Sequence, residues 1–486
     1  MALLDTVRSE RLAKIERLKE VGMEVYPART ARTHTVDEFL RNHESLKNSG
    51  ERVTLAGRIM SLREHGGSLF LDIFDGTKGQ CFVQREKLKE VPYDLFISTV
   101  DTGDVVEFSG RAFTTKRGMP SLDATAWRML AKSLRPLPDE WFGIKDEDER
   151  YRKRYLDILL TKDLADRIRR RSIFWNSFRR FLTERKFIEV ETPVLETTTG
   201  GADARPFVTH HNALDMDVYL RISGGELWQK RLMIAGLPKV FEIGRVFRNE
   251  GMSHEHAQDY TQMEFYWAYA DYQKGMDLVE QLYKHVASET FGTTKFTVGE
   301  FEIDLGAPWE RYDYTQTIQK YAGVDIRAAD LKSIETKLQE LGVKFSSEGW
   351  NISRAIDTLW KHCRRQISGP GFLIGVPKSL SPLSKSDPIH PEVTERFQPI
   401  IGGSELGNGY SELNDPMDQA ERFAEQAKLR EAGDKEAQMY DHEFVEALEY
   451  GMPPACGFGV SERLFSFLEG VSVREAQIFP LMRPRK

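Results

Sequence analysis

The segments VFEIGRVFRNEG (240–251) and YTQMEFYWAYADY (260–272) flank a short loop, and apolar or aromatic residues alternate with polar ones in both. Alternation of this kind is typical of β-strands, so the two segments predict a strand–loop–strand hairpin. Strand side chains point alternately to two faces. One face of the second strand therefore carries Gln262, Glu264, Tyr266 and Ala268.

Arg248 and Glu250 stand at the end of the first strand of this hairpin. The guanidinium of Arg248 offers a bidentate fork to a phosphate or a carboxylate. The Glu250 carboxylate can accept a hydrogen bond from an adenine amino group. A surface ion pair between Arg248 and a nearby carboxylate explains this fragment equally well, so further segments have to decide.

The segment IIGGSELGNGYSELNDP (400–416) combines acidic residues with a glycine-rich turn. Asn408, Tyr410 and Glu412 recur at a period of two and share a strand face, with Glu405 just before the turn. Carboxylates so placed hold Mg²⁺ or a cationic substrate. An exposed acidic loop is the alternative, but the glycines indicate close approach of the backbone to another group.

Two further regions have the chemistry of a ligand site. In GMPPACGFGVSERLFSFL (451–468) a glycine-rich strand leads into a helix near Arg463. An arginine at a helix N-terminus can face triphosphate oxygens, although a tight strand–helix turn accounts for the same residues. In YLRISGGELWQKRL (219–232) Glu226 lies at the end of an expected strand, before an apparent helix. The chain has no GxxxxGK[ST] phosphate loop.

The pattern of elements divides the chain in two. A charged helix is expected over residues 1–22, followed by a small closed β-barrel of the OB-fold type. The five barrel strands are expected at 53–62, 68–75, 79–84, 104–115 and 121–130. A linker with two prolines is expected around 134–150, and the remainder favours an α+β domain on an antiparallel sheet. We set the domains at 1–145 and 146–486.

Composition limits the class of protein. The 486 residues are 40% hydrophobic and 29% charged, which is ordinary for a folded chain. No apolar run reaches the ~20 residues of a membrane span, and no signal peptide is apparent, so a cytoplasmic protein without membrane contact is expected. The net charge of −7 argues weakly against a dedicated nucleic-acid binder. The three cysteines form no CxxC pair and are expected to be buried free thiols.

Together these segments resemble the class II aminoacyl-tRNA synthetases, specifically the bacterial-type lysyl-tRNA synthetases, over the whole chain. Motif 1 is FIEVETPVL (187–195), motif 2 is FRNEG with its hairpin, and motif 3 is GFGVSERL. THHNALDMDVYLRI, FYWAYADY and GNGYSELNDP narrow the resemblance to the lysine enzymes. It implies an antiparallel catalytic sheet, an anticodon-binding OB domain, a homodimer, Mg²⁺ as cofactor, and ATP, L-lysine and lysine tRNA as partners.

Family roles transfer to matching residues. Arg248 resembles the catalytic arginine on the α-phosphate and amino-acid carboxylate, and Arg463 the arginine on the γ-phosphate. The other nucleotide-site residues implied are Glu250 and Tyr260 at adenine and His256 at a phosphate. For lysine, the resemblance implies Gly201 and Glu226 at the α-amino group, and Glu264, Tyr266, Asn408, Tyr410 and Glu412 along the side chain. Glu405 and Gln398 stand at metal positions, and Arg63, Phe70 and Gln80 at anticodon positions.

Four departures from the family pattern fall near these sites. Gln398 stands where the family has a Mg²⁺-binding glutamate, and motif 3 is one residue short before Arg463. The motif 2 loop reads HAQDYT instead of HNPEFT, and the strand before Glu226 has one residue more, at Gly224-Gly225. An active synthetase is the favoured interpretation. A lysine-activating paralogue that modifies proteins and a non-catalytic RNA-binding relative are the alternatives.

Overall fold

The computed structural model describes residues 2–88, 92–138, 144–251, 257–345, 350–433 and 437–485. Contacts divide the chain into two compact units, Met1–Leu160 and Thr161–Lys486. The domain boundary that we set between residues 145 and 146 from the sequence stays a prediction. Within the described ranges, no helix has both the length and the apolar character to cross a membrane.

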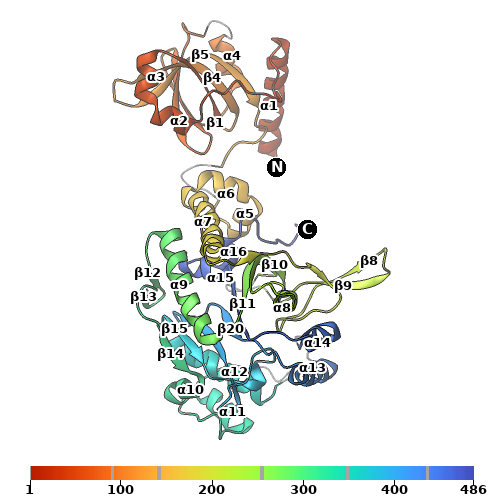
Figure 1. Ribbon diagram of the computed structural model, residues 1–486. Coiled ribbons are helices and arrows are strands. Elements are labelled where there is room, and N and C mark those ends of the chain that lie inside the picture. The colour runs from red at the N-terminus through yellow and green to blue at the C-terminus, as the bar shows by residue number, and fades with distance from the viewer. Residues whose placement is uncertain are drawn as a thin grey trace. The chain divides into compact units, whose positions relative to one another are not determined.

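The first unit is built on a closed five-stranded barrel, drawn in orange in Figure 1. Its strands pair in the order β1-β2-β3-β5-β4, and β3 runs parallel to β5 while the other pairs are antiparallel. The strands are β1 (Arg52–His65), β2 (Ser68–Phe74), β3 (Lys78–Gln84), β4 (Val105–Thr114) and β5 (Pro120–Ala131). All five strands expected from the sequence are present. Alternate residues such as Leu69, Leu71 and Ile73 fill the barrel, which leaves the side chains between them on its outer face.

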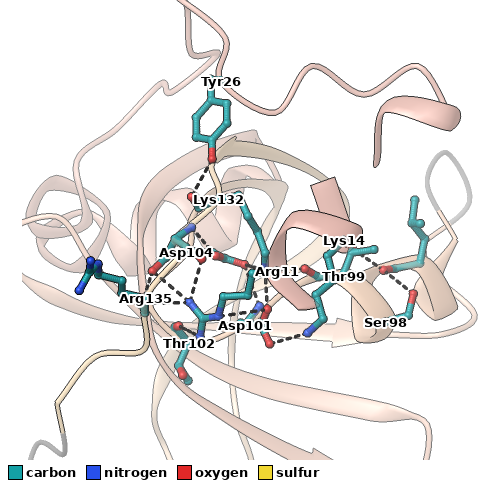
Figure 2. A network of polar contacts seen from close by, with 12 residues as sticks. Arg11, Lys14, Tyr26, Ser98, Thr99, Asp101, Thr102, Asp104, Lys132 and Arg135 are labelled. Atoms are coloured by element: carbon teal, nitrogen blue, oxygen red, sulfur yellow. Dashed lines mark hydrogen bonds and ion pairs between the residues drawn. The ribbon is translucent and has the colours of Figure 1, made fainter. Parts of the chain in front are cut away.

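Helices α1 (Ala2–Glu20), α2 (Val36–Arg41), α3 (His43–Ser49) and α4 (Tyr93–Thr99) lie around this barrel. Helices α5 (Glu147–Arg152) and α6 (Arg154–Leu160) follow in sequence at the end of the unit. A buried polar network, shown in Figure 2, fastens α1 to the barrel. Lys132 is fully buried and its ammonium lies 2.5 Å from Asp101 and 2.7 Å from Asp104. Arg11 and Lys14, two of the basic residues of α1, also contact Asp101, so they are bound within the protein.

The second unit is organised around a sheet with the strand order β14-β15-β18-β20-β21-β11-β10-β6, to which β19 adds at β18. All of its pairs are antiparallel except β14 with β15 and β10 with β6. The strands are β6 (Ile188–Glu189), β10 (Lys239–Phe247), β11 (Asp259–Ala268), β14 (Glu310–Asp313), β15 (Gly371–Ile374), β18 (Arg396–Ile401), β19 (Ser404–Glu405), β20 (Asn408–Ser411) and β21 (Ala455–Ser461). The α+β class with a mainly antiparallel sheet is therefore confirmed.

Helices cover this sheet and form satellite groups. They are α7 (Lys162–Glu184), α8 (Glu226–Ile234), α9 (Tyr272–Phe291), α10 (Tyr314–Ala322), α11 (Leu331–Glu340), α12 (Ile352–Cys363), α13 (Pro416–Glu431), α14 (His442–Glu449), α15 (Arg463–Leu468) and α16 (Val473–Ala476), with short 3₁₀ turns η1 (Arg364–Gln366) and η2 (Lys378–Leu380). Smaller pairings involve β7 (Leu195–Glu196), β8 (Val208–His211), β9 (Met216–Leu220), β12 (Lys295–Val298), β13 (Phe301–Asp304), β16 (Val376–Pro377) and β17 (Val393–Thr394). Figure 1 shows α10, α11 and α12 gathered beside β14 and β15, with which they share one apolar core.

Two local expectations need correction. Glu226 is the first residue of α8 and not the last residue of a strand, because β9 already ends at Leu220. Gly225 adopts φ +82°, a left-handed conformation that glycine tolerates, and this turns the chain into the helix. The linker expected at 134–150 also ends early, since α5 begins at Glu147 with Asp146 as its N-cap.

Candidate active site

A polar cavity of about 320 Å³ opens beside the central strands of the large sheet. Its walls come from the start of α8, from β11, β18, β20 and β21, and from the segments 201–203 and 380–383. Every residue assigned to lysine from the sequence lines this one cavity: Gly201, Glu226, Glu264, Tyr266, Asn408, Tyr410 and Glu412. Segments that are far apart in sequence thus supply a single concentrated site.

Three carboxylates dominate the cavity. Glu226, Glu264 and Glu412 are only 4%, 4% and 2% exposed. The Lys230 ammonium lies 2.5 Å from Oε2 of Glu412, whereas Oε1 has no hydrogen-bond partner among the described residues. Buried polar atoms normally find partners. Glu412 therefore keeps acceptor capacity for a ligand that carries N–H groups.

The other two carboxylates are held by neighbouring donors. Glu264 accepts hydrogen bonds from the Gly224 amide and the Gln262 side chain, both at 2.7 Å, and from the Tyr266 hydroxyl at 3.2 Å. The Tyr410 hydroxyl donates to Glu226 at 2.5 Å. The Lys230 ammonium also donates to Glu226, at 2.7 Å, so these bonds fix the positions of both carboxylates at the cavity wall.

Burial shifts the titration of this group. Desolvation raises the pKa of Glu412 to about 8, even though the Lys230 ammonium opposes the shift. Desolvation and the Glu226 charge raise the pKa of Glu264 to about 7. Desolvation also raises the pKa of Tyr266 and Tyr410 well above the usual value, so both phenols stay neutral. A cationic ligand would offset the electrostatic cost of placing several carboxylates in a site shielded from water.

Gly457 makes the close packing of this site possible. A Cβ at this position would lie 2.2 Å from Oε1 of Glu412 and 2.5 Å from the Tyr266 ring. Only a residue without a side chain lets β21 pass this close to both groups. The third motif therefore requires glycine at this position for steric reasons.

Arg248 stands at the junction of the polar cavity with two smaller ones. It lines the polar cavity and both neighbours, which measure about 140 and 150 Å³. Its Nε donates to the Ile222 carbonyl at 3.1 Å, and its guanidinium lies 5.7 Å from the Tyr260 ring centroid. Glu250, Tyr260 and Arg463 line the 140 Å³ cavity together with Arg248. His256, assigned to a phosphate from the sequence, lies outside the described residues.

The shortened third motif still brings Arg463 to these cavities. β21 pairs with β11 without a register shift from Ala455 to Ser461. Arg463 follows two residues later as the first residue of α15 and lines both cavities that flank Arg248. The missing residue thus does not remove the arginine from the site.

The two residues at metal positions line a larger cavity of about 670 Å³ beside the first. Gln398 lies on β18 and Glu405 on β19. Oε1 of Glu405 accepts a hydrogen bond from the Trp360 indole at 2.5 Å. Oε1 of Glu405 also lies 3.6 Å from Nε of Arg364. In the ranges that the structure describes, Oε2 of Glu405 and the Gln398 side-chain amide make no hydrogen bond, so Oε2 and the amide oxygen can serve a cation. No cluster of three or more acidic, histidine or cysteine side chains suited to a metal occurs among these residues.

Comparison with known proteins agrees with this arrangement. The family of class II tRNA synthetases (D, K and N) matches residues 146–483, and an OB-fold nucleic acid binding domain matches residues 53–130. The lysine–tRNA ligase of Roseiflexus castenholzii is 42% identical over 490 residues, covering 99% of this chain and 100% of that protein. The lysine–tRNA ligase of Thermotoga maritima is 41% identical over 491 residues, covering 100% of this chain and 97% of that protein.

The chain belongs to the lysine–tRNA ligase family of class II tRNA synthetases. The barrel of this synthetase is the matched OB-fold, and its outer face carries the three residues assigned to the anticodon. Arg63 on β1 pairs with Phe70 on β2, and Gln80 on β3 pairs with Asp72 on β2. Gln80 accepts a hydrogen bond from Ser121 at 2.9 Å.

Sequence reasoning missed several residues of this synthetase. Phe70 stacks on Phe82 with ring centroids 4.4 Å apart, and Phe82 contacts Phe113 at 5.7 Å, which makes a half-buried aromatic surface. Strand alternation from Gln80 would have found Phe82. Lys230 was also overlooked, although it follows Glu226 by four residues, the spacing of an ion pair on one helix face.

Proposed function

We propose that this chain activates L-lysine with ATP and transfers the lysyl group to the 3′ end of lysine tRNA. The observation that supports this most is the cavity with Glu226, Glu264 and Glu412, together with Arg248, which lines this cavity and both smaller cavities beside it. Carboxylates suit the two ammonium groups of lysine, and Arg248 suits its carboxylate. An acidic amino acid would meet repulsion in this cavity.

The first step is an in-line attack of the lysine carboxylate on the α-phosphate of ATP. Such a step depends mainly on positioning and on stabilisation of charge. Arg248 borders both spaces and would hold the attacking carboxylate and the α-phosphate together. Glu250 would accept a hydrogen bond from the adenine amino group beside Tyr260, and Arg463 would neutralise the leaving pyrophosphate. No covalent nucleophile from the protein is required.

Mg²⁺ is the cofactor that we propose. Glu405 and the Gln398 amide oxygen would hold it together with phosphate oxygens, since Mg²⁺ in such sites relies on one or two carboxylates and on substrate phosphates. The cation would supply positive charge against the leaving pyrophosphate. Having one carboxylate and one neutral amide, the site would bind the ion more weakly than a pair of carboxylates.

The N-terminal barrel would read the anticodon of the tRNA. OB-folds bind single-stranded nucleic acid by stacking bases on aromatic side chains and by reading base edges with polar ones. Phe70 would stack a base, supported by Phe82 and Phe113, while Gln80 would meet a base edge and Arg63 a phosphate. Arg63 donates to Asp72 at 2.9 Å and is more than half exposed, so it is accessible to a phosphate.

We further propose a homodimer formed through the first motif. Each of β6, β7 and β8 carries an exposed apolar side chain, namely Ile188, Leu195 and Val208 at 48%, 49% and 57% exposed. Burial of these side chains between two copies would remove apolar surface from water. Light scattering at micromolar concentration should give twice the monomer mass, and a monomeric mass would refute the proposal.

Paired assays test the function as a whole. Lysine-dependent ATP–pyrophosphate exchange should occur, which a non-catalytic RNA-binding relative would not support. Charging of lysine tRNA should follow, which a protein-modifying paralogue would not perform. Exchange with aspartate or asparagine in place of lysine would overturn the assignment of the cavity.

A further inference from the structure

A lysine of the protein itself lies behind the wall of the lysine cavity. Lys230 lies on α8, is 0% exposed, and does not line the cavity. Its ammonium lies 2.7 Å from Glu226 and 2.5 Å from Glu412. It also lies 5.5 Å from the Tyr410 ring centroid and 5.9 Å from that of Tyr266, so aromatic faces and two carboxylates enclose it.

The charges around the cavity indicate that Lys230 does more than fill space. When all three are ionised, which a bound cation favours, Glu226, Glu264 and Glu412 carry three negative charges, and Lys230 reduces the sum to two. The two ammonium groups of a free lysine would balance the remainder, while its carboxylate pairs with Arg248. Without Lys230, the site would hold one unmatched negative charge, which a buried environment does not tolerate and which a proton would remove.

We propose that Lys230 is a positioning and specificity-determining residue, a resident ammonium that holds the Glu226 and Glu412 side chains at the cavity and matches the site to a ligand with two ammonium groups. The proposal rests on the proposed lysine-activating function. Lys230 acts through the two glutamates and does not itself touch the substrate. Its four-residue offset from Glu226 on α8 fixes the pair, and Glu412 reaches it from the end of β20.

The groups that face this ammonium define the expected pH behaviour. They are Glu226 on α8, Tyr266 on β11, Tyr410 on β20 and Glu412 just after it. Glu264 on β11 and Cys456 on β21 interact in turn with Glu412. Desolvation alone would lower the pKa of Lys230, but Glu226 and Glu412 outweigh it and the net shift is upward, so the ammonium stays charged. Removing an adjacent cation raises the pKa of a carboxyl by 1–3 units, so that of Glu412 should rise by about 2.

The test compares Lys230→Met with wild type and with Lys132→Met in lysine-dependent pyrophosphate exchange. Lys132 is a matched control, since it is also a fully buried lysine between two carboxylates but lies in the barrel unit (Figure 2). We expect Lys230→Met to lower kcat/KM for lysine about 100-fold at pH 7, with the KM for ATP unchanged. The log of kcat/KM should still rise with pH at pH 9, whereas wild type and Lys132→Met should level off near pH 8.

Chemical rescue separates charge from packing. In Lys230→Ala, added n-propylammonium should restore kcat/KM for lysine about tenfold, and sodium chloride at equal ionic strength should not. A wild-type lysine KM and pH profile in Lys230→Met, or no rescue of Lys230→Ala, would overturn the role of Lys230. If both neutral variants fail to fold, Lys230→Arg should keep the wild-type plateau near pH 8, and loss of that plateau would overturn the role. Absence of lysine-dependent exchange in wild type would instead refute the proposed function.

Discussion

Replacing Glu412 by glutamine removes one negative charge from the end of the lysine cavity at nearly constant shape. Glu412 is 2% exposed and its two oxygens have no hydrogen-bond donor within the described ranges, apart from the ion contact with Lys230. In the variant, the amide oxygen can still face Lys230. The amide N–H₂ group then points toward the substrate ammonium. Both groups are hydrogen-bond donors, so no hydrogen bond forms between them.

The magnitude follows from burial. Losing one partner of a buried ion pair costs about 3 kcal/mol at the lower end of the usual range, or roughly 150-fold in kcat/KM for lysine. Because the pKa of Glu412 is raised to about 8, the full difference is expected only at pH 8.5 or above. At pH 7 the wild-type carboxyl is about one-tenth ionised, which costs the wild type about 1.4 kcal/mol and narrows the difference to roughly 15-fold.

The assay is lysine-dependent pyrophosphate exchange at pH 7 and 8.5, with ATP titrated separately. The KM for ATP should stay within about twofold of wild type, since Glu412 lines neither of the cavities that contain Arg463. Glu107→Gln is the matched control, because Glu107 is a buried carboxylate paired with Arg128 in the barrel. A wild-type kcat/KM for lysine in Glu412→Gln at pH 8.5 would show that another group pairs with the ε-ammonium.

Three further predictions follow from the site and the barrel. Wild-type kcat/KM for lysine should rise about tenfold per pH unit below pH 7 and level off above pH 8, because protonation neutralises Glu412 below its raised pKa; a flat profile from pH 6 to 9 would contradict this. Gln398→Glu should lower the Mg²⁺ midpoint of pyrophosphate exchange by restoring a charged ligand, and an equal or higher midpoint would exclude Gln398 from the metal site. Phe70→Ala should weaken tRNA charging roughly tenfold through the loss of base stacking and leave exchange unchanged, whereas equal loss of both activities would contradict its anticodon role.

Strand alternation in the sequence was sufficient for the barrel strands and for part of the cavity, whereas Gly201 and Glu226 were assigned through the family resemblance. Strand alternation places Asn408, Tyr410 and Glu412 on one face, and the structure has all three lining one cavity. The same rule found the five barrel strands. Such predictions succeed because a strand puts every second side chain on the same side whatever it packs against.

Only the tertiary structure decided how the charges are partnered. Glu226 and Glu412 are 186 residues apart in the chain, and it is the approach of α8 to β20 that places Lys230 between them. Two departures from the family pattern fall near the site. The left-handed turn at Gly225 accommodates the insertion at Gly224-Gly225, and the regular β11–β21 pairing accommodates the shortened third motif. Sequence spacing specifies which face a residue occupies. Which distant face it meets, and therefore the sum of charges in the cavity, is fixed by the packing of elements that are remote in sequence.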